Sequence, residues 1–251
     1  MMLLWIVIYS ILGSVGAISA ASVFLFLGER YRNRLIPILV SFAIGTLLSA
    51  AFLGLIPRAI ENLLNKVELV MTLVLGGILI FFLVEKAILW RQCQVESCED
   101  LPHASGPMIL LGDSVHNLTD GIVITAAFLT DFSIGIAVGI SVIIHEVAHE
   151  TSDFGILLHA GYSKRKAFTY NVISSSITIR AALFSFFLLE RVQSVVPYLL
   201  ALSAAGFIYI SLSDLIPALH ERSNLVHISE QLIFIAAGIF LMVAIMNLDI
   251  H

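Results

Sequence analysis

Residues 134–160 read IGIAVGISVIIHEVAHETSDFGILLHA, an apolar run that contains three histidines and three acids. The run is long enough to cross a bilayer, which takes about 20 residues in a helix. Glu146, Glu150 and Asp153 would each cost roughly 2.5–3.5 kcal/mol near the centre of a lipid-exposed helix. The apolar residues of the run each return only about 0.3–0.6 kcal/mol. Lipid therefore cannot surround this helix, and its polar stripe must face the interior of a helical bundle.

The rest of the chain has the composition of a membrane protein. Of its 251 residues, 59% are hydrophobic and only 12% are charged, whereas soluble domains carry about a quarter charged residues. Apolar runs recur from end to end, and the connections between them are short. We predict one all-α integral membrane domain over residues 1–251, with eight transmembrane helices at about 3–27, 35–57, 67–90, 107–130, 133–161, 166–189, 196–218 and 229–248.

Lys and Arg are unevenly divided between the two sets of connections. One set carries Arg30, Arg32, Arg34, Lys86, Arg91, Lys164, Arg165, Lys166 and Arg222, and the other only Arg58, Lys66 and Arg191. The positive-inside rule assigns the richer set to the cytoplasm, so both termini are expected outside, in a plasma or inner cell membrane. Cys93 and Cys98 then fall in a cytoplasmic loop and should remain thiols.

Two segments that belong to opposite halves of the chain resemble each other. The second predicted span closes on AAFLGLIPRA (50–59) and the seventh on YISLSDLIPAL (209–219). Spans five positions apart run in opposite directions through a membrane. We therefore expect an inverted 3+2+3 repeat, an arrangement that places transporter sites at the repeat interface.

The fourth and fifth spans carry polar residues at helical spacing. Positions that differ by three or four lie on one helix face, so each span presents one set of nitrogen and oxygen ligands. If the two helices pack together, they can surround a divalent cation, and imidazole with carboxylate suits Zn²⁺, Fe²⁺ or Mn²⁺. The candidate ligands are His116, Asn117 and Asp120 in the fourth span, with His145, Glu146, His149 and Glu150 in the fifth.

The stretches GDSVHNLTDG (112–121) and HEVAHETSDFGILLHAGYSKRKA (145–167) resemble the fourth- and fifth-span signatures of the ZIP metal-ion transporters. The similarity is to the subfamily whose fifth span carries HExPHE. It implies a transport site near the membrane midplane whose cargo is Zn²⁺, with Fe²⁺, Mn²⁺ or Cd²⁺ as alternatives. The residues it implies are His116, Asp120, His145 and His149 as principal ligands, Asn117 and Glu146 at an adjoining position, Glu150 within the motif, and Asn171 as a polar neighbour in the sixth span.

This chain also departs from the family pattern. Ala148 stands where the family usually has Pro, so the break that a proline gives a helix is not expected here. In the second span, Gly54 and Arg58 stand where many members have His and Glu.

Two other classes of function are weighed against transport. HExxH is also the zinc motif of metalloproteases, in which His145 and His149 would hold the metal and Glu146 would be the base. Proteolysis has no use for a second ligand-bearing helix, whereas a translocation site requires one. A metal-sensing receptor would need a soluble output domain. We therefore expect a transporter and not an enzyme. The expected partners are a divalent metal ion and the lipid bilayer, with a homodimer left open and no nucleic acid.

Overall fold

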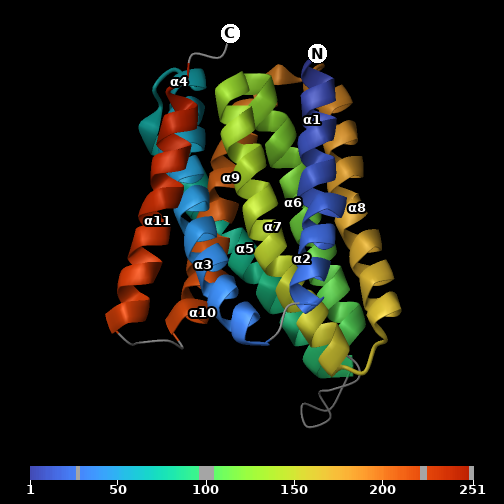
Figure 1. Ribbon diagram of the computed structural model, residues 1–251. Helices are drawn as coiled ribbons and strands as arrows, with labels where there is room; N and C mark the ends of the chain where they lie inside the picture. The colour runs from blue at the N-terminus through green and yellow to red at the C-terminus, as the bar shows by residue number, and fades with distance from the viewer. Residues whose placement is uncertain (27–28, 96–104, 221–224, 249–251) are drawn as a thin grey trace.

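The computed structural model describes residues 1–26, 29–95, 105–220 and 225–248, which form an all-helical bundle (Figure 1). Eight rods follow one another along the chain. In order, they are α1 (Met2–Ile11), η1 (Leu12–Gly16) and α2 (Ala17–Phe26); α3 (Glu29–Ser49), η2 (Ala50–Leu55) and α4 (Ile56–Asn62); α5 (Val67–Val95); α6 (Ser105–Thr130); α7 (Phe132–His159); α8 (Lys164–Leu189); α9 (Val196–Ile210), η4 (Ser211–Leu215) and α10 (Ile216–His220), preceded by the short turn η3 (Gln193–Val195); and α11 (Leu225–Met246).

Seven of these rods are apolar and long enough to cross a membrane, counted over the described residues. The remaining rod is α6, whose polar residues face α7, α8 and α9. The predicted all-α, membrane-spanning fold is confirmed. Several helices exceed the predicted spans because they continue beyond the apolar stretch: the second rod covers 29–62 instead of 35–57, and α5 ends at Val95 instead of residue 90. Cys93 therefore lies in the last turn of α5 and not in a loop, while Cys98 lies outside the described residues.

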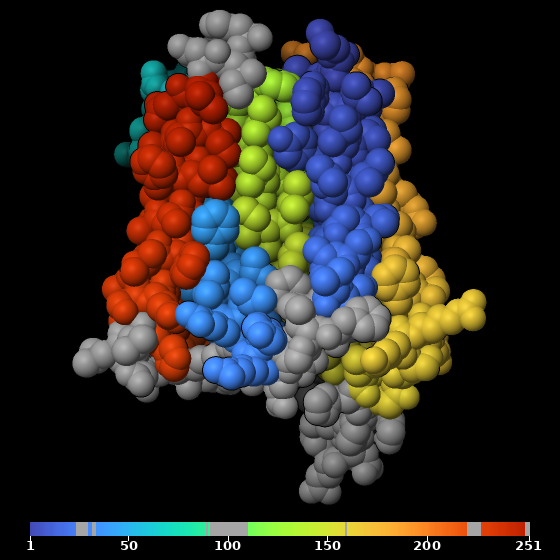
Figure 2. Space-filling view, in the orientation of Figure 1, coloured from blue at the N-terminus to red at the C-terminus, as the bar shows by residue number. Residues whose placement is uncertain are grey.

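Helices α6 and α7 occupy the middle of the bundle, and the other helices surround them. Figure 2 shows α7 on one face between α11 with α3 and α1 with α2. Only 17% of the membrane-spanning stretch is buried in α5 and in α11. In α7 the buried share of this stretch is 56%. The most apolar rods thus form the periphery, and the polar rods are covered by protein.

The two LIP segments share a backbone distortion. A wide π-helical turn, η2, precedes Pro57, and a second, η4, precedes Pro217. Proline lacks an N–H and its ring clashes with the carbonyl four residues earlier, so a wider turn relieves the conflict. The two rods run in opposite directions (Figure 1). The shared turn and the opposite directions are consistent with the predicted inverted repeat. The repeat itself stays a prediction.

Glycine allows the closest helix contacts. A Cβ built on Gly121 would lie 2.3 Å from the carbonyl oxygen of Thr178 and 2.7 Å from the Cβ of Ala181, both on α8. A Cβ on Gly45 of α3 would lie 2.2 Å from the carbonyl oxygen of Ile235 on α11. No residue with a side chain fits at either distance, so the glycines fix how near α8 and α11 approach their neighbours.

Replacing Gly121 with alanine should destabilise the fold. The methyl group must push α8 away from α6, and overpacking of this kind costs about 1–3 kcal/mol. The matched control is Gly76→Ala in α5, where a Cβ meets nothing within 4 Å. That control should be neutral or gain up to about 1 kcal/mol of helix propensity. Thermal unfolding in detergent measures both, and equal melting temperatures for the two variants would contradict the close-contact explanation.

Candidate metal centre

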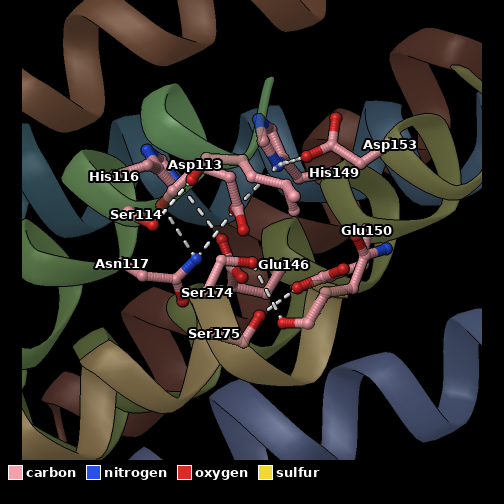
Figure 3. Close-up of polar contacts among 12 residues, drawn as sticks. Asp113, Ser114, His116, Asn117, Glu146, His149, Glu150, Asp153, Ser174 and Ser175 are labelled. Atoms are coloured by element: carbon pink, nitrogen blue, oxygen red, sulfur yellow. Dashed lines mark hydrogen bonds and ion pairs between the residues drawn. The ribbon is translucent and has the colours of Figure 1, made fainter. Parts of the chain in front are cut away.

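Helices α6 and α7 form a tight antiparallel hairpin. A single residue, Asp131, joins them, and its carboxylate accepts a 3.0 Å hydrogen bond from the backbone N–H of Ile134 at the start of α7. The turn fixes the register of the two polar stripes. Asp120 therefore lies level with His145. His116 lies near Glu146 and His149, and Asp113 lies near His149 (Figure 3).

The first group of ligands, which we call group 1, consists of His116, Asp120, His145 and Glu146. Its four ligand atoms lie within 4.8 Å of one another. The two imidazole Nε2 atoms are 3.0 Å apart; His116 Nε2 is 3.1 Å from Glu146 Oε1, and His145 Nε2 is 3.3 Å from Asp120 Oδ2. Ligands of a tetrahedral Zn²⁺, bound at about 2.0–2.1 Å, are about 3.3 Å from each other. Group 1 therefore has the spacing of a tetrahedral metal site.

The ring of His145 is held in the orientation that metal binding requires. Its Nδ1 lies 2.8 Å from the backbone carbonyl oxygen of Ser141, and a carbonyl can only accept a hydrogen bond. Nδ1 therefore carries a hydrogen, and Nε2 is the ring nitrogen that faces group 1. His145 is 1% exposed. The geometry presents a buried nitrogen, Nε2, as a candidate ligand atom.

The second group of ligands, which we call group 2, consists of Asp113, His149 and Asp153. It lies about one helical turn from group 1 on both helices, toward the end where α6 begins. His149 Nδ1 is 3.7 Å from Asp113 Oδ1 and 3.6 Å from Asp153 Oδ2. The rings of His149 and His116 stack with their centroids 5.0 Å apart, so the two groups are adjacent.

The third group of ligands, which we call group 3, consists of Asp113, Glu146 and Glu150. It contains only oxygen ligands and faces α8. Ser175 donates a hydrogen bond to Glu150, while the second carboxylate oxygen of Glu150 has no partner among the described residues. Asn171, four residues before Ser175 on α8, is fully buried. Neither its Nδ2 nor its Oδ1 has a hydrogen-bond partner among the described residues. Group 3 shares Glu146 with group 1 and Asp113 with group 2.

Asn117 is already engaged in hydrogen bonds. Its Nδ2 donates to Asp113 Oδ1 at 2.8 Å and to the backbone carbonyl of Asp113 at 3.0 Å, and its Oδ1 accepts from Thr178 at 2.5 Å. Asn117 thus fixes the carboxylate of Asp113 and ties α6 to α8. In this structure it acts on the cluster by positioning Asp113.

A cavity of about 280 Å³ opens beside the cluster. Asp113, His116, His149 and Asp153 line one wall, and Glu85, Tyr209 and Asp214 of the third and seventh rods line another. Tyr209 donates a hydrogen bond to Glu85. The cavity lies beside group 2, in the half of the bundle where α6 begins and α7 ends.

The structure brings most of the predicted ligands into one buried cluster. His116, Asp120, His145 and Glu146 share group 1, but His149, expected with them, lies in group 2. Glu150 lies in group 3, while Asn117 and Asn171 lie outside all three groups of His and acidic ligands.

Asp113 and Asp153 were not among the predicted ligands. Asp113 stands four residues before Asn117, and Asp153 four residues after His149, so the helical spacing that defined the two stripes already extended to both. Helix α7 is unbroken through Ala148, as expected where the family's proline is missing.

Comparison with known proteins gives consistent matches. The family model described as ZIP zinc transporter matches residues 2–106 and 91–246. The chain is 30% identical over 219 residues to zinc transporter ZIP13 of Pongo abelii, which covers 82% of this chain and 65% of that protein. It is 35% identical over 139 residues to zinc transporter zipt-7.2 of Caenorhabditis elegans (53% and 30%) and 38% identical over 112 residues to human zinc transporter ZIP4 (45% and 17%).

The chain thus spans less than two thirds of the length of each of these relatives. The matches give no support to the metalloprotease alternative. The family model nevertheless extends over nearly the whole sequence, including α6 and α7. The chain belongs to the ZIP zinc transporter family.

Proposed function

We propose that this protein carries Zn²⁺ across a membrane and that the ion binds at group 1 during transport. The observation that supports this proposal is the convergence of two imidazole nitrogens and two carboxylate oxygens, from two helices, at tetrahedral spacing. The relatives that the chain matches are named zinc transporters. Fe²⁺, Mn²⁺ and Cd²⁺ are compatible with the same ligands.

The burial of group 1 also favours a bound cation. Both carboxylate oxygens of Glu146 and one oxygen of Asp120 have no hydrogen-bond partner among the described residues. A buried carboxylate oxygen without a hydrogen bond is costly inside a membrane protein, and a divalent ion offsets that cost. A site of mixed His and carboxylate ligands releases its metal more readily than a closed site of four thiolates does. A carrier needs a site that releases its metal.

Transport explains the ligands better than proteolysis does. A catalytic zinc site uses three protein ligands and keeps an open position for water. In this chain, Glu146, the residue that would be the base, lies 3.1 Å from His116 Nε2 and shares group 1 with Asp120. This position supports a role for Glu146 as a fourth ligand.

We propose uptake toward the cytoplasm, with both termini outside. The cavity beside group 2 lies in the half of the bundle that carries the Arg- and Lys-rich connections, which the positive-inside rule assigns to the cytoplasm. At the opposite end, Arg58 Nη2 lies 3.3 Å from Asp131 Oδ2 and links α4 to the start of α7. In this arrangement the site is reached from the inside, and rocking of the helix groups would open the other side.

Removing a ligand of group 1 should abolish most zinc transport. Asp120→Asn and His145→Gln each take one of the four ligands, so we expect initial ⁶⁵Zn uptake into proteoliposomes to fall at least about tenfold. Glu68→Gln is the control, because Glu68 is an exposed carboxylate in the first turn of α5. Uptake that survives both ligand changes would refute the site, and peptide cleavage without uptake would favour the protease.

The proposed orientation predicts opposite labelling at the two ends. In a chain with Cys93 and Cys98 replaced by serine, Asp214→Cys lies at the cavity and Asn62→Cys at the other end of the bundle. A membrane-impermeant thiol reagent should label Asp214→Cys in inside-out vesicles and Asn62→Cys in right-side-out vesicles. The reverse pattern would invert the topology.

A further inference from the structure

We propose that one face of α8 is a docking surface for a transmembrane helix of another protein. The face, which we call the Arg180 face, consists of Ile173, Arg180, Phe184 and Phe187. The partner helix would carry an Asp or Glu at the depth of Arg180. Such a partner is separate from the metal cargo of the proposed function, and the buried metal ligands take no part in binding it.

The Arg180 face lies at the edge of the bundle. Helix α8 packs on α6 and borders α1 and α7, and its other side meets none of the described helices (Figure 1). The apolar members of the face are 56% to 71% exposed, and Arg180 is exposed with them. Their offsets from Arg180, of four or seven positions, place all of them on one side of the helix. Arg180 is the only charged residue between positions 167 and 189, so one guanidinium interrupts a surface that otherwise suits lipid.

Arg180 lies too deep to belong to either membrane surface. The candidate span of this helix is Lys164–Leu189. At a rise of 1.5 Å per residue, Arg180 is about 24 Å from the first residue of the span and about 14 Å from the last. A hydrocarbon core of about 30 Å, centred on the span, ends about 4 Å short of each end. Arg180 is therefore about 10 Å inside the nearer boundary of the core and about 20 Å inside the other.

The direction of the Arg180 side chain makes the nearer boundary harder to reach. Every Cα–Cβ bond of a helix tilts toward the N-terminus of that helix. For Arg180 this tilt leads toward the start of α8, where the boundary is the more distant one. Long basic side chains snorkel to the headgroups when they lie near the end of a helix, and Arg180 does not. Contact with a headgroup is thus a poor explanation for this residue.

In the part of the chain that the structure describes, Arg180 has no partner of opposite charge. The ion pairs that arginine makes there belong to Arg34 and Arg58. Asp214, the exposed acid of the seventh rod, accepts a hydrogen bond from Ser213. Arginines within a membrane normally face the interior of a bundle, where they pair with acids or carbonyl groups. Because Arg180 faces away from the bundle, its pairing group has to come from outside the chain.

A second copy of this chain does not supply the carboxylate. Two copies that met through the Arg180 face, about a twofold axis along the membrane normal, would place both guanidinium groups at the same depth, where like charges repel. Asp214 lies six residues before His220, so it is about 9 Å from the end of the bundle where α8 begins, or about 15 Å from the depth of Arg180. Glu85 is held by Tyr209 in the wall of the cavity. The partner is therefore a helix of a different protein.

Binding of model transmembrane peptides tests the docking surface. The full chain is reconstituted in phosphatidylcholine vesicles with a dilute poly-leucine peptide that carries one central Asp and a terminal dansyl group, and energy transfer from the protein's tryptophans reports association. We expect the Asp peptide to bind about three- to tenfold more tightly than an all-leucine peptide, as a polar contact between membrane helices allows. Arg180→Gln should remove this preference and Arg180→Lys should keep most of it. The control Arg191→Gln, beyond the end of α8, should leave it unchanged.

Three results would overturn the docking surface. They are equal binding of the two peptides, a preference that survives Arg180→Gln, and a preference for a peptide whose Asp lies in its last turn, level with the headgroups. Phosphatidylglycerol added to the vesicles separates a helix contact from a lipid contact. If it abolishes the preference, Arg180 binds a lipid phosphate and the partner helix is refuted, whereas a retained preference supports the helix. None of these measurements uses a metal, so their failure would leave the transport proposal standing.

Discussion

Five carboxylates buried between α6, α7 and α8 are the constraint on which the rest of this structure depends. Asp113, Asp120, Glu146, Glu150 and Asp153 are each at most 6% exposed. Among the described residues, the ion pairs of Asp113, Asp120, Glu146 and Asp153 are all with histidine, whereas the pairs that involve arginine lie elsewhere, at Arg34 and Arg58. Buried acids without a permanent cation are tolerated only when positive charge or protons can reach them. In the proposed function, a divalent ion would supply that charge and could also leave.

The packing around the cluster divides it into a fixed side and an open side. On the fixed side, Gly121 lets α8 approach α6, and Asn117 joins Asp113 to Thr178 of α8. On the other side, His149 is the most exposed of the ligands and borders the cavity. In the proposed function, the packed side would hold the ligands at the spacing of a metal site, and the cavity would let water and the ion exchange. A carrier needs both properties in one site.

Much of the fold could be predicted from the sequence because the bilayer admits few solutions. Runs of about 20 apolar residues must be helices, and a helix that carries Glu146 and Glu150 must turn them inward. The spacing of His116 and Asp120, and of His145 and His149, similarly predicts the two ligand faces. What spacing could not give was the partition of those ligands. His149 can turn its ring toward either neighbouring level, and the structure places it against Asp113 and Asp153 because the α6–α7 register brings them level.

The π-helical turns and the hydrogen bonds of Asn117 could not be predicted from the sequence either. The two LIP segments suggested a relation between distant rods, yet η2 and η4 are wide turns that depend on how proline is accommodated inside a packed helix. The same holds for Asn117, whose helical face was predicted but whose hydrogen bonds to Asp113 and Thr178 depend on the position of α8. A ligand type can be inferred from one helix, whereas a positioning residue is defined only by what packs behind it.

The three groups of ligands share carboxylates, and this sharing bears on how an ion would move between them. Glu146 belongs to groups 1 and 3, and Asp113 belongs to groups 2 and 3. In the proposed function, a cation that moved from group 1 toward the cavity would therefore exchange ligands one at a time and keep a carboxylate within reach throughout. Full release into a dry interior between two separate sites would expose a divalent charge to a low dielectric, which costs many kcal/mol. Sharing carboxylates between neighbouring levels lowers that barrier, so the close spacing of acids that makes this cluster costly when empty is also what would let it conduct its cargo.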